Sequence, residues 1–495
     1  MDLGRFARCA LGCSLIAGCS IALSPVGYAE GKRHKNIRET DHAVPHVSTL
    51  GVNADEVVHL FVRELVRKHD DDDDDDDDGD RHRARKHFQK RGDDRDDKHR
   101  PRKAVLMVHG ANIPPLALFD LRYKDYSWGR ALAKAGFDVF ILDSQGIGRS
   151  PLPDRALAPL TDPCNVTPAQ QAAFLRDYPP FVAEPCDASF PFPFLLINSK
   201  SEWDEVSTVV DYIIAERGVE KVALIGVSRG SIVVGPYTVQ HPEKVESLFL
   251  QAPNLNPAAL PGIGSDALAP PVKSFGQLPD LSTRFVPCTA AEVATNSCPG
   301  ILPEATRPHR ILPPLNATFP AAMALGTRAD LVNRWQPEIQ CDGQVEEGVQ
   351  DRVWRAIMEN DKLPSTWGPP PAGAPAGTAP EGLMRNRSFF PWGWTPSVAS
   401  RLQVPTLIVF GEHDKEVGGP GLPLAVTSVR LYDTIPAGVP KLLFKVACAG
   451  HLMVWERQRN VLHRLSKQWL KHGSVEGHST GKFFVTTDGD PVPME

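Results

Sequence analysis

The sequence lacks the features that mark nucleic-acid-binding and metal-binding proteins. Its formal net charge at pH 7 is −6 over 495 residues, and it has no basic patch interleaved with aromatic residues. This argues against a chain whose main task is to neutralise phosphate backbones. No C-x-x-C spacing and no His/Cys cluster typical of a zinc site is present. We therefore expect no nucleic-acid partner, no metal and no cofactor.

The sequence also lacks an internal repeat and a confident membrane-spanning run, and its start is typical of an export signal. Arg5 and Arg8 precede an apolar stretch that is too short and too rich in small residues to span a bilayer. Residues 1–29 are therefore a predicted export signal with two open processing routes. Cleavage after Ala29 gives a periplasmic or secreted protein, whereas a bacterial lipobox ending at Cys19 gives a membrane-anchored lipoprotein.

Six cysteines follow the predicted signal, which in an exported chain indicates disulfides. Cys164 with Cys186 and Cys288 with Cys298 are the local pairings, and these would leave Cys341 for Cys448. Six cysteines allow 15 pairings, so the connectivity stays open.

The chain has 42% hydrophobic and 23% charged residues, enough for one large core or two smaller ones. Nine consecutive aspartates, Asp70 to Asp78, interrupt it between two predicted strands at residues 57–66 and 103–109. Such a run buries too little apolar surface to order itself, so we expect a hydrated, disordered loop at about residues 68–102. Calcium binding is the alternative, but the spacing that shapes a calcium site is missing.

Short apolar strands alternate with helical segments along the rest of the chain. After the strand at 103–109, which continues in VLMVHG to residue 110, strands are predicted at 138–143, 222–227, 245–253, 406–414 and 441–447. Helices are predicted at 126–136, 201–218 and 457–471. This alternation predicts an α/β fold with a mostly parallel central sheet and helices on both faces.

Two long, proline-rich excursions interrupt the alternation. They divide the predicted core into a first part, which contains an excursion at 151–200, and a second part after a cap or lid inserted at 254–400. The resulting bounds are 44–253 for the first part, 401–472 for the second part and 473–495 for a C-terminal tail.

The most informative segment is VALIGVSRG at 222–230, in which an apolar strand delivers Ser228 between Gly226 and Gly230 just before a helix. This arrangement predicts a nucleophile elbow, a sharp turn that holds a serine hydroxyl where a base can reach it. A second G-x-S-x-G, around Ser479, follows a polar stretch without a buried strand, so it is interpreted as a loop of the tail.

A serine nucleophile needs a base, an acid that orients the base, and donors for an oxyanion. Asp414 ends the strand TLIVFGEHD, and His451 follows the strand KLLFKVA. The chain order Ser228, Asp414, His451 is the one expected of a triad in this architecture. Glu412 and Glu416 flank the same turn as Asp414 and are alternatives for the orienting acid.

The predicted oxyanion hole uses two backbone N–H groups. One belongs to Arg229, directly after the nucleophile, and the other to Ala111 in the loop after VLMVHG, with Asn112 as second choice. We expect His109 to structure this loop rather than to act as the base. The Arg229 side chain is expected to face solvent or an internal partner in preference to an acidic substrate group.

Five motifs together resemble the α/β-hydrolase superfamily: HGAN (109–112), DSQGIGRS (143–150), GVSRG (226–230), GEHD (411–414) and AGH (449–451). The resemblance covers about residues 55–472. It implies transfer of an acyl group to water through an acyl-enzyme on Ser228, with Asp414 and His451 as partners. The serine elbow separates the chain from those members of the superfamily that use an aspartate nucleophile.

The expected function is cleavage of carboxylic esters, with a small-molecule or lipid-like ester as substrate. An exported peptidase of the aminopeptidase type is the enzymatic alternative, and a non-catalytic binding protein on the same fold is the alternative from another class. Gly235 and Pro236 depart from the resemblance because proline should kink or shorten the helix after the elbow.

Overall fold

The computed structural model describes most of the predicted core. Its residues are 36–49, 57–68, 103–150, 199–256, 268, 285–287, 309–311 and, with short gaps, 325–494. Several predictions fall outside the described residues. These are the export signal, the aspartate run, nearly all of the excursion at 151–200 and the two local cysteine pairings. The described residues belong to one compact unit, which spans His34–Glu495.

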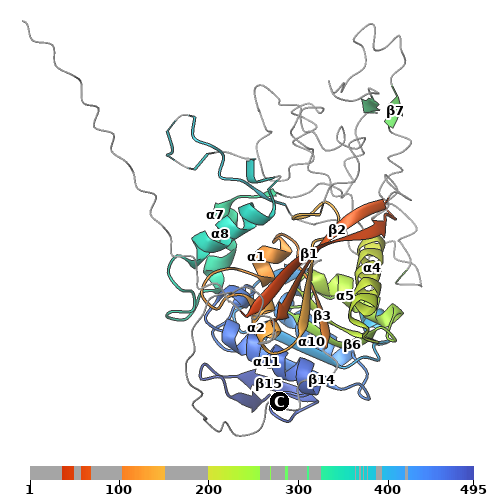
Figure 1. Ribbon diagram of the computed structural model, residues 1–495. Helices are drawn as coiled ribbons and strands as arrows, with labels where there is room; N and C mark the ends of the chain where they lie inside the picture. Colours follow the sequence, from red (N-terminus) through yellow and green to blue (C-terminus); the bar gives the residue numbers. More distant parts are fainter. Residues whose placement is uncertain are drawn as a thin grey trace, which may run out of the picture. The chain divides into compact units, whose positions relative to one another are not determined.

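The centre of this unit is a sheet of ten strands among the described residues, drawn edge-on in Figure 1. In spatial order the strands are β1 (Ile37–Val47), β2 (Val57–Arg67), β4 (Asp138–Leu142), β3 (Ala104–Val108), β5 (Val222–Val227), β6 (Val245–Gln251), β11 (Thr406–Gly411), β14 (Lys441–Val446), β15 (Gly481–Val485) and β16 (Pro491–Pro493). The strands from β4 to β15 run parallel to one another. β2 is antiparallel to both β1 and β4, and β16 is antiparallel to β15. The mostly parallel sheet predicted from the sequence is confirmed.

The apolar composition of the central strands explains their place in the sheet. Every residue of β3, β4 and β5 is buried, as expected when helices cover both faces of a parallel sheet. On one face lie α1 (Pro115–Phe119), α2 (Trp128–Lys134) and α11 (Arg459–His472). On the other lie α4 (Ser199–Arg217), α5 (Gly230–Gln240), α9 (Pro396–Ala399) and α10 (Leu424–Thr434). The two faces have separate hydrophobic clusters.

Of the predicted cap, residues 325–385 pack onto the first of these faces, whereas α9 packs onto the other. Residues 325–385 contain β9 (Leu325–Gly326), α7 (Arg328–Trp335), η5 (Gln336–Glu338), α8 (Val349–Asn360), η6 (Pro364–Thr366) and β10 (Met384–Arg385). Leu331, Trp335, Val353 and Ile357 belong to the same hydrophobic cluster as α1 and α11. This stretch is thus anchored in the core, and a covering lid stays a prediction. The short strands β7 (Phe285–Pro287) and β8 (His309–Ile311) pair with each other.

The two edges of the sheet differ from the prediction. Residues 473–495 were predicted to form a tail, but they continue the sheet: β15 pairs in parallel with β14, and β16 returns antiparallel. The tail assignment is wrong because Phe483 and Val485 are buried at alternating positions of a short strand whose other residues are polar or half-exposed. The core also begins earlier than residue 44, with β1, a largely exposed edge strand at Ile37–Val47.

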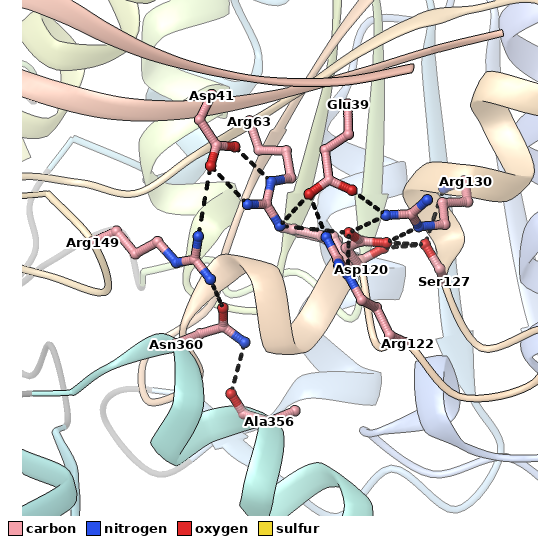
Figure 2. Close-up of polar contacts among 11 residues, drawn as sticks. Glu39, Asp41, Arg63, Asp120, Arg122, Ser127, Arg130, Arg149, Ala356 and Asn360 are labelled. Carbon is pink, nitrogen blue, oxygen red and sulfur yellow. Dashed lines mark hydrogen bonds and ion pairs between the residues drawn. The ribbon is translucent and has the colours of Figure 1, made fainter. Parts of the chain in front are cut away.

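A network of arginine and carboxylate side chains ties the β1/β2 hairpin to the helices below it (Figure 2). Arg63 of β2 binds Asp41 through two nitrogens at 2.7 and 2.9 Å. Arg130 of α2 binds Asp120 at 2.7 Å and also Glu39 of β1. Arg63 and Asp120 are buried, so the opposite charges of the network compensate for the water that each of them has lost.

None of the helices in the part of the chain that the structure describes has the length and apolar character needed to cross a membrane.

Candidate active site

Ser228 stands at the carboxyl end of β5 in a strained backbone conformation. Its φ is +52°, in the left-handed region that residues other than glycine rarely adopt. A Cβ at position 226 would lie 2.6 Å from Val234, and one at position 230 would lie 2.5 Å from the Val108 carbonyl oxygen. Both neighbours of the turn must therefore be glycine. Despite Pro236 in its interior, α5 runs without a break from Gly230 to Gln240.

Asp414 and His451 follow adjacent parallel strands, β11 and β14, at the same edge of the sheet. His451 Nδ1 lies 3.2 Å from Asp414 Oδ2, and both side chains are buried. Burial is the largest single effect and lowers the pKa of His451. The charge and hydrogen bond of Asp414, together with the charges of Glu416 and Glu338, outweigh it and raise this pKa to about 9. The geometry suits an acid that fixes the orientation and tautomer of a histidine base.

The two alternative acids face other partners. Glu412 lies 3.6 Å from the Lys445 ammonium and accepts the backbone N–H of Cys448, whereas Glu416 lies 3.4 Å from Arg334. Among the three carboxylates of this turn, Asp414 is the one in contact with His451.

Gln251, the last residue of β6, connects the serine and histidine loops. Its carbonyl oxygen accepts the backbone N–H of Ser228 at 2.8 Å, and its side-chain Nε2 donates to the carbonyl oxygen of His451 at 3.0 Å. The serine loop follows β5, which is next to β6, and the histidine loop follows β14, which is two strands from β6 on the other side. One buried glutamine therefore connects the two loops. The sequence analysis missed this residue, since a glutamine at a strand end carries no distinctive pattern.

One predicted oxyanion residue, Arg229, directly follows Ser228, and the other, Ala111, lies in the loop that approaches Ser228 at Gly110. His109 Nδ1 lies 2.8 Å from the carbonyl oxygen of Ile113 and so closes the loop that contains Ala111. In this loop, a Cβ at Gly110 would lie 3.3 Å from Ser228 Cβ. Arg229 follows Ser228 as the first residue before α5. The two backbone N–H groups stay a prediction as oxyanion donors, and His109 has the loop-closing contact expected of it.

The Arg229 side chain points inward and pairs with Glu202 of α4. Two parallel hydrogen bonds of 3.0 and 2.9 Å join the guanidinium to the carboxylate, and both side chains are buried. Burial lowers the pKa of Arg229 to about 9. The internal partner that the sequence analysis expected is thus Glu202.

Ser479 has none of the surroundings of Ser228. It is exposed in the turn between α11 and β15, where Val475 and His478 form an isolated bridge. The reading of this second G-x-S-x-G as a surface loop agrees with this position.

Two buried carboxylates that the sequence did not single out lie beneath the histidine loop. Glu338, at the end of η5, accepts the backbone N–H groups of His451 at 2.6 Å and Lys415 at 2.7 Å. Glu456 accepts the backbone N–H of Gly450 at 2.8 Å and the indole N–H of Trp335 at 2.9 Å. Burial raises the pKa of Glu338 to about 7. No motif could have revealed Glu338, which lies 113 residues before the histidine whose loop it holds.

Cys341 and Cys448 are joined by a disulfide, the pair that the two local cysteine pairings would leave. His413 lies close to both sulfur atoms, so these three residues are the group in the described ranges that could surround a metal ion. In the disulfide the sulfurs are not thiolates, the form that binds metals.

A separate hollow of about 670 Å³ is lined by residues of α10, β11 and β14, and its lining does not include Ser228, Asp414 or His451.

Residues 103–276 match the family model of the alpha/beta hydrolase fold. The strand order and the elbow at the end of β5 fit this match, so the described core has the α/β-hydrolase fold. The match supports the assignment of the protein to the hydrolases. No curated protein matches the sequence.

Three solved structures illustrate the likeness. A meta-cleavage product hydrolase from Pseudomonas fluorescens IP01 is 14% identical, with 75% of this chain and 92% of that chain covered and a TM-score of 0.38. A thermophilic esterase from Thermogutta terrifontis is 12% identical, with 87% and 98% covered and a TM-score of 0.42. Naproxen esterase from Bacillus subtilis is 12% identical, with 88% and 92% covered and a TM-score of 0.39. At such values the activities of these proteins say nothing about this chain.

Proposed function

We propose that the protein is a serine hydrolase that cleaves carboxylic esters through an acyl-enzyme on Ser228. The observation that carries the proposal is the strained turn of Ser228, whose backbone N–H and the carbonyl of His451 are both bound by Gln251. Strain at a nucleophile is retained where the surrounding structure over-determines it and function needs it. The neighbouring His451 and Asp414 pair supplies a base with an orienting acid.

In the proposed mechanism, Ser228 Oγ attacks the ester carbonyl carbon while His451 Nε2 takes the hydroxyl proton. Nδ1–H donates to Asp414, which stabilises the imidazolium that forms. The backbone N–H groups of Ala111 and Arg229 stabilise the oxyanion. Collapse of the tetrahedral intermediate releases the alcohol, which receives the proton from His451. Water, activated by the same imidazole, then hydrolyses the acyl-enzyme and regenerates Ser228.

The substrate is proposed to be a small-molecule or lipid-like carboxylic ester. An aminopeptidase binds the free ammonium of its substrate through a carboxylate. Among the described residues, the carboxylate of Glu202 beside the elbow is already paired with Arg229. This favours an ester over the substrate of an aminopeptidase.

Labelling with a fluorophosphonate, read by intact mass, tests the proposal because this probe requires an activated serine but little substrate specificity. We expect one adduct on the wild-type protein and on Ser479→Ala, and none on Ser228→Ala. Hydrolysis of p-nitrophenyl acetate and butyrate should be lost in the same variant. A folded wild-type protein that is not labelled would refute the function, and turnover of peptide anilides without turnover of esters would replace it with a peptidase.

The site of action is proposed to be outside the cytoplasm, on the basis of the predicted signal at residues 1–29. Cell fractionation with intact mass of the product tests this. A mature chain starting at Glu30 supports ordinary cleavage, a diacylglyceryl adduct on Cys19 supports membrane anchoring, and a full-length cytoplasmic chain would refute export.

A further inference from the structure

Glu338 lies where the predicted cap segment meets both the histidine loop and the acid loop. Its side chain is buried, and each carboxylate oxygen has its own partner. Oε2 accepts the backbone N–H of His451 at 2.6 Å, and Oε1 accepts the backbone N–H of Lys415, the residue after Asp414, at 2.7 Å. One carboxylate thus binds the backbone at or next to both members of the His451–Asp414 pair.

The segment that carries Glu338 is itself fixed to the histidine loop at three further points. The disulfide joins Cys341 to Cys448, three residues before His451. Gln344 donates to the Glu338 carbonyl and to Glu456 at 3.0 Å each. Trp335, fully buried at the end of α7, donates to the same Glu456 at 2.9 Å. The placement of Glu338 is therefore held by covalent and hydrogen-bonded contacts on both sides of it.

The structure leaves no room for a side chain at position 450 of the histidine loop. A Cβ at Gly450 would lie 2.6 Å from Glu338 Oε2 and 2.9 Å from Glu456 Oε1. The glycine of AGH is thus required so that the backbone before His451 can approach the two carboxylates.

We propose that Glu338 is a positioning residue, which holds the His451 and Asp414 loops in register by accepting one backbone N–H from each. The inference rests on the function proposed above. Glu338 does not contact the reacting atoms of the mechanism; it acts through the backbone of the base and of the residue next to the acid.

The charge of Glu338 gives this role a measurable signature. Burial raises its pKa to about 7, and the Asp414 charge adds to this, whereas His451 and the two backbone N–H groups oppose it. Glu338 in turn helps to raise the pKa of His451. The other charged groups close to it are the Glu456 carboxylate and Lys415, whose ammonium donates to the Pro337 carbonyl.

The test compares Glu338→Gln, Glu338→Asp and the control Glu347→Gln, a nearby exposed glutamate before α8. Fluorophosphonate labelling and p-nitrophenyl ester kinetics are measured from pH 5.5 to 10, with melting temperatures. A carboxamide has one acceptor oxygen, so Glu338→Gln leaves one of the two N–H groups facing a donor. We expect its kcat to fall tenfold or more, KM to change less than threefold, and the acid limb of kcat/KM to move to lower pH. Glu347→Gln should match the wild type.

Glu338→Asp distinguishes the effect of the negative charge from the effect of side-chain length. It keeps the carboxylate but is one methylene shorter, so we expect a reduced kcat with the acid limb near its wild-type position. Wild-type kinetics and an unshifted limb in a folded Glu338→Gln variant would overturn the inference. If that variant does not fold, a folded Glu338→Asp with wild-type kcat would overturn it, and loss of the fold in both variants would assign Glu338 a structural role instead. Absence of labelling in the wild type would refute the proposed function itself, and the inference with it.

Discussion

The side-chain amide of Gln251 donates a hydrogen bond to the carbonyl oxygen of His451 over 3.0 Å. The same residue accepts the backbone N–H of Ser228 through its carbonyl oxygen. The loops that carry the proposed nucleophile and base are thus spaced by one residue of the sheet rather than by contacts between the loops alone. β6 is hydrogen-bonded to β5 on one side and to β11 on the other. The distance between the two loops is therefore fixed by the parallel sheet.

This relationship predicts that Gln251→Leu lowers the rate of the proposed reaction. Leucine has a similar volume but cannot hold the His451 carbonyl, and a displacement of about 1 Å at a base can cost up to about 100-fold in rate. We expect fluorophosphonate labelling to slow tenfold to 100-fold, measured as the second-order rate constant. The matched control is Gln240→Leu, at the exposed end of α5, whose amide binds only the Pro236 carbonyl among the contacts described. An unchanged labelling rate in folded Gln251→Leu would show that the tether is not needed.

The Asp414 carboxylate predicts the pH dependence of the activity. The base must be neutral. Asp414 is the largest of the carboxylate contributions that, with those of Glu416 and Glu338, raise the pKa of His451 to about 9 against the effect of burial. The acid limb of kcat/KM for the wild type is therefore expected near pH 9, with the rate rising as His451 loses its proton. Asp414→Asn should move this limb to lower pH and lower the plateau by about 10⁴-fold, because the wrong tautomer is favoured.

A pH–rate profile on p-nitrophenyl butyrate checks this prediction, with Asp433→Asn as control. Asp433 pairs with Lys482 on the surface at 2.9 Å, so its replacement should leave the limb in place. A limb that stays near pH 9 in Asp414→Asn would mean that another group controls the protonation of His451.

The core of the fold and the contact between Asp414 and His451 could be predicted from the sequence because the decisive signals are local. The nucleophile elbow can be recognised within nine residues, as an apolar strand that ends in glycine, serine and glycine. Asp414 can be recognised because it directly follows an apolar strand. Gln251 and Glu338 could not be found in this way. Their roles depend on the pairing of β6 with its neighbours and on a segment 113 residues from His451, which sequence patterns do not encode.

The sheet edges were missed for a related reason. β1 is exposed at many positions, and β15 is a five-residue strand after a glycine-containing turn. β1 lies at one edge of the sheet and β15 next to the other. Both strands bury few residues, so their hydrophobic pattern is weak. Only the register with β2 and β14 identifies them.

The pair of Arg229 with Glu202 predicts a large stability effect next to the nucleophile. Both groups are buried and joined by two hydrogen bonds, and removal of one partner leaves an uncompensated charge, which costs about 3–5 kcal/mol. We expect Arg229→Met and Glu202→Met each to lower the free energy of unfolding by about this amount. The double variant should lose less than the sum of the two single variants.

Urea denaturation of the four proteins forms a double-mutant cycle that measures this coupling. Additive losses would indicate that the two charges are solvated independently. The backbone N–H of Arg229 is retained in every variant, so fluorophosphonate labelling of the folded proteins should persist.

The last prediction concerns stability against pH and rests on a carboxyl in α4. Glu205 is buried, and Oε1 has no hydrogen-bond partner among the described residues. Burial raises its pKa from 4.5 to about 8, even though the backbone N–H of Gln145 stabilises the charged form. A carboxyl whose pKa is higher in the folded state binds its proton more tightly there. Its contribution to stability is full below pH 4.5 and is lost as the pH rises through 8, by up to about 1.4 kcal/mol per pH unit.

Glu205→Gln should therefore flatten the decline in the free energy of unfolding between pH 4.5 and 8.5 and be relatively more stable than the wild type at the upper end. Asp143, whose pKa burial also raises to about 8, keeps part of the decline in the variant. Urea denaturation at pH 4.5, 6.5 and 8.5 measures the slopes, and Glu216→Gln, on an exposed position of the same helix, is the control. Equal slopes for wild type and Glu205→Gln would show that Glu205 is ionised in the folded protein throughout this range.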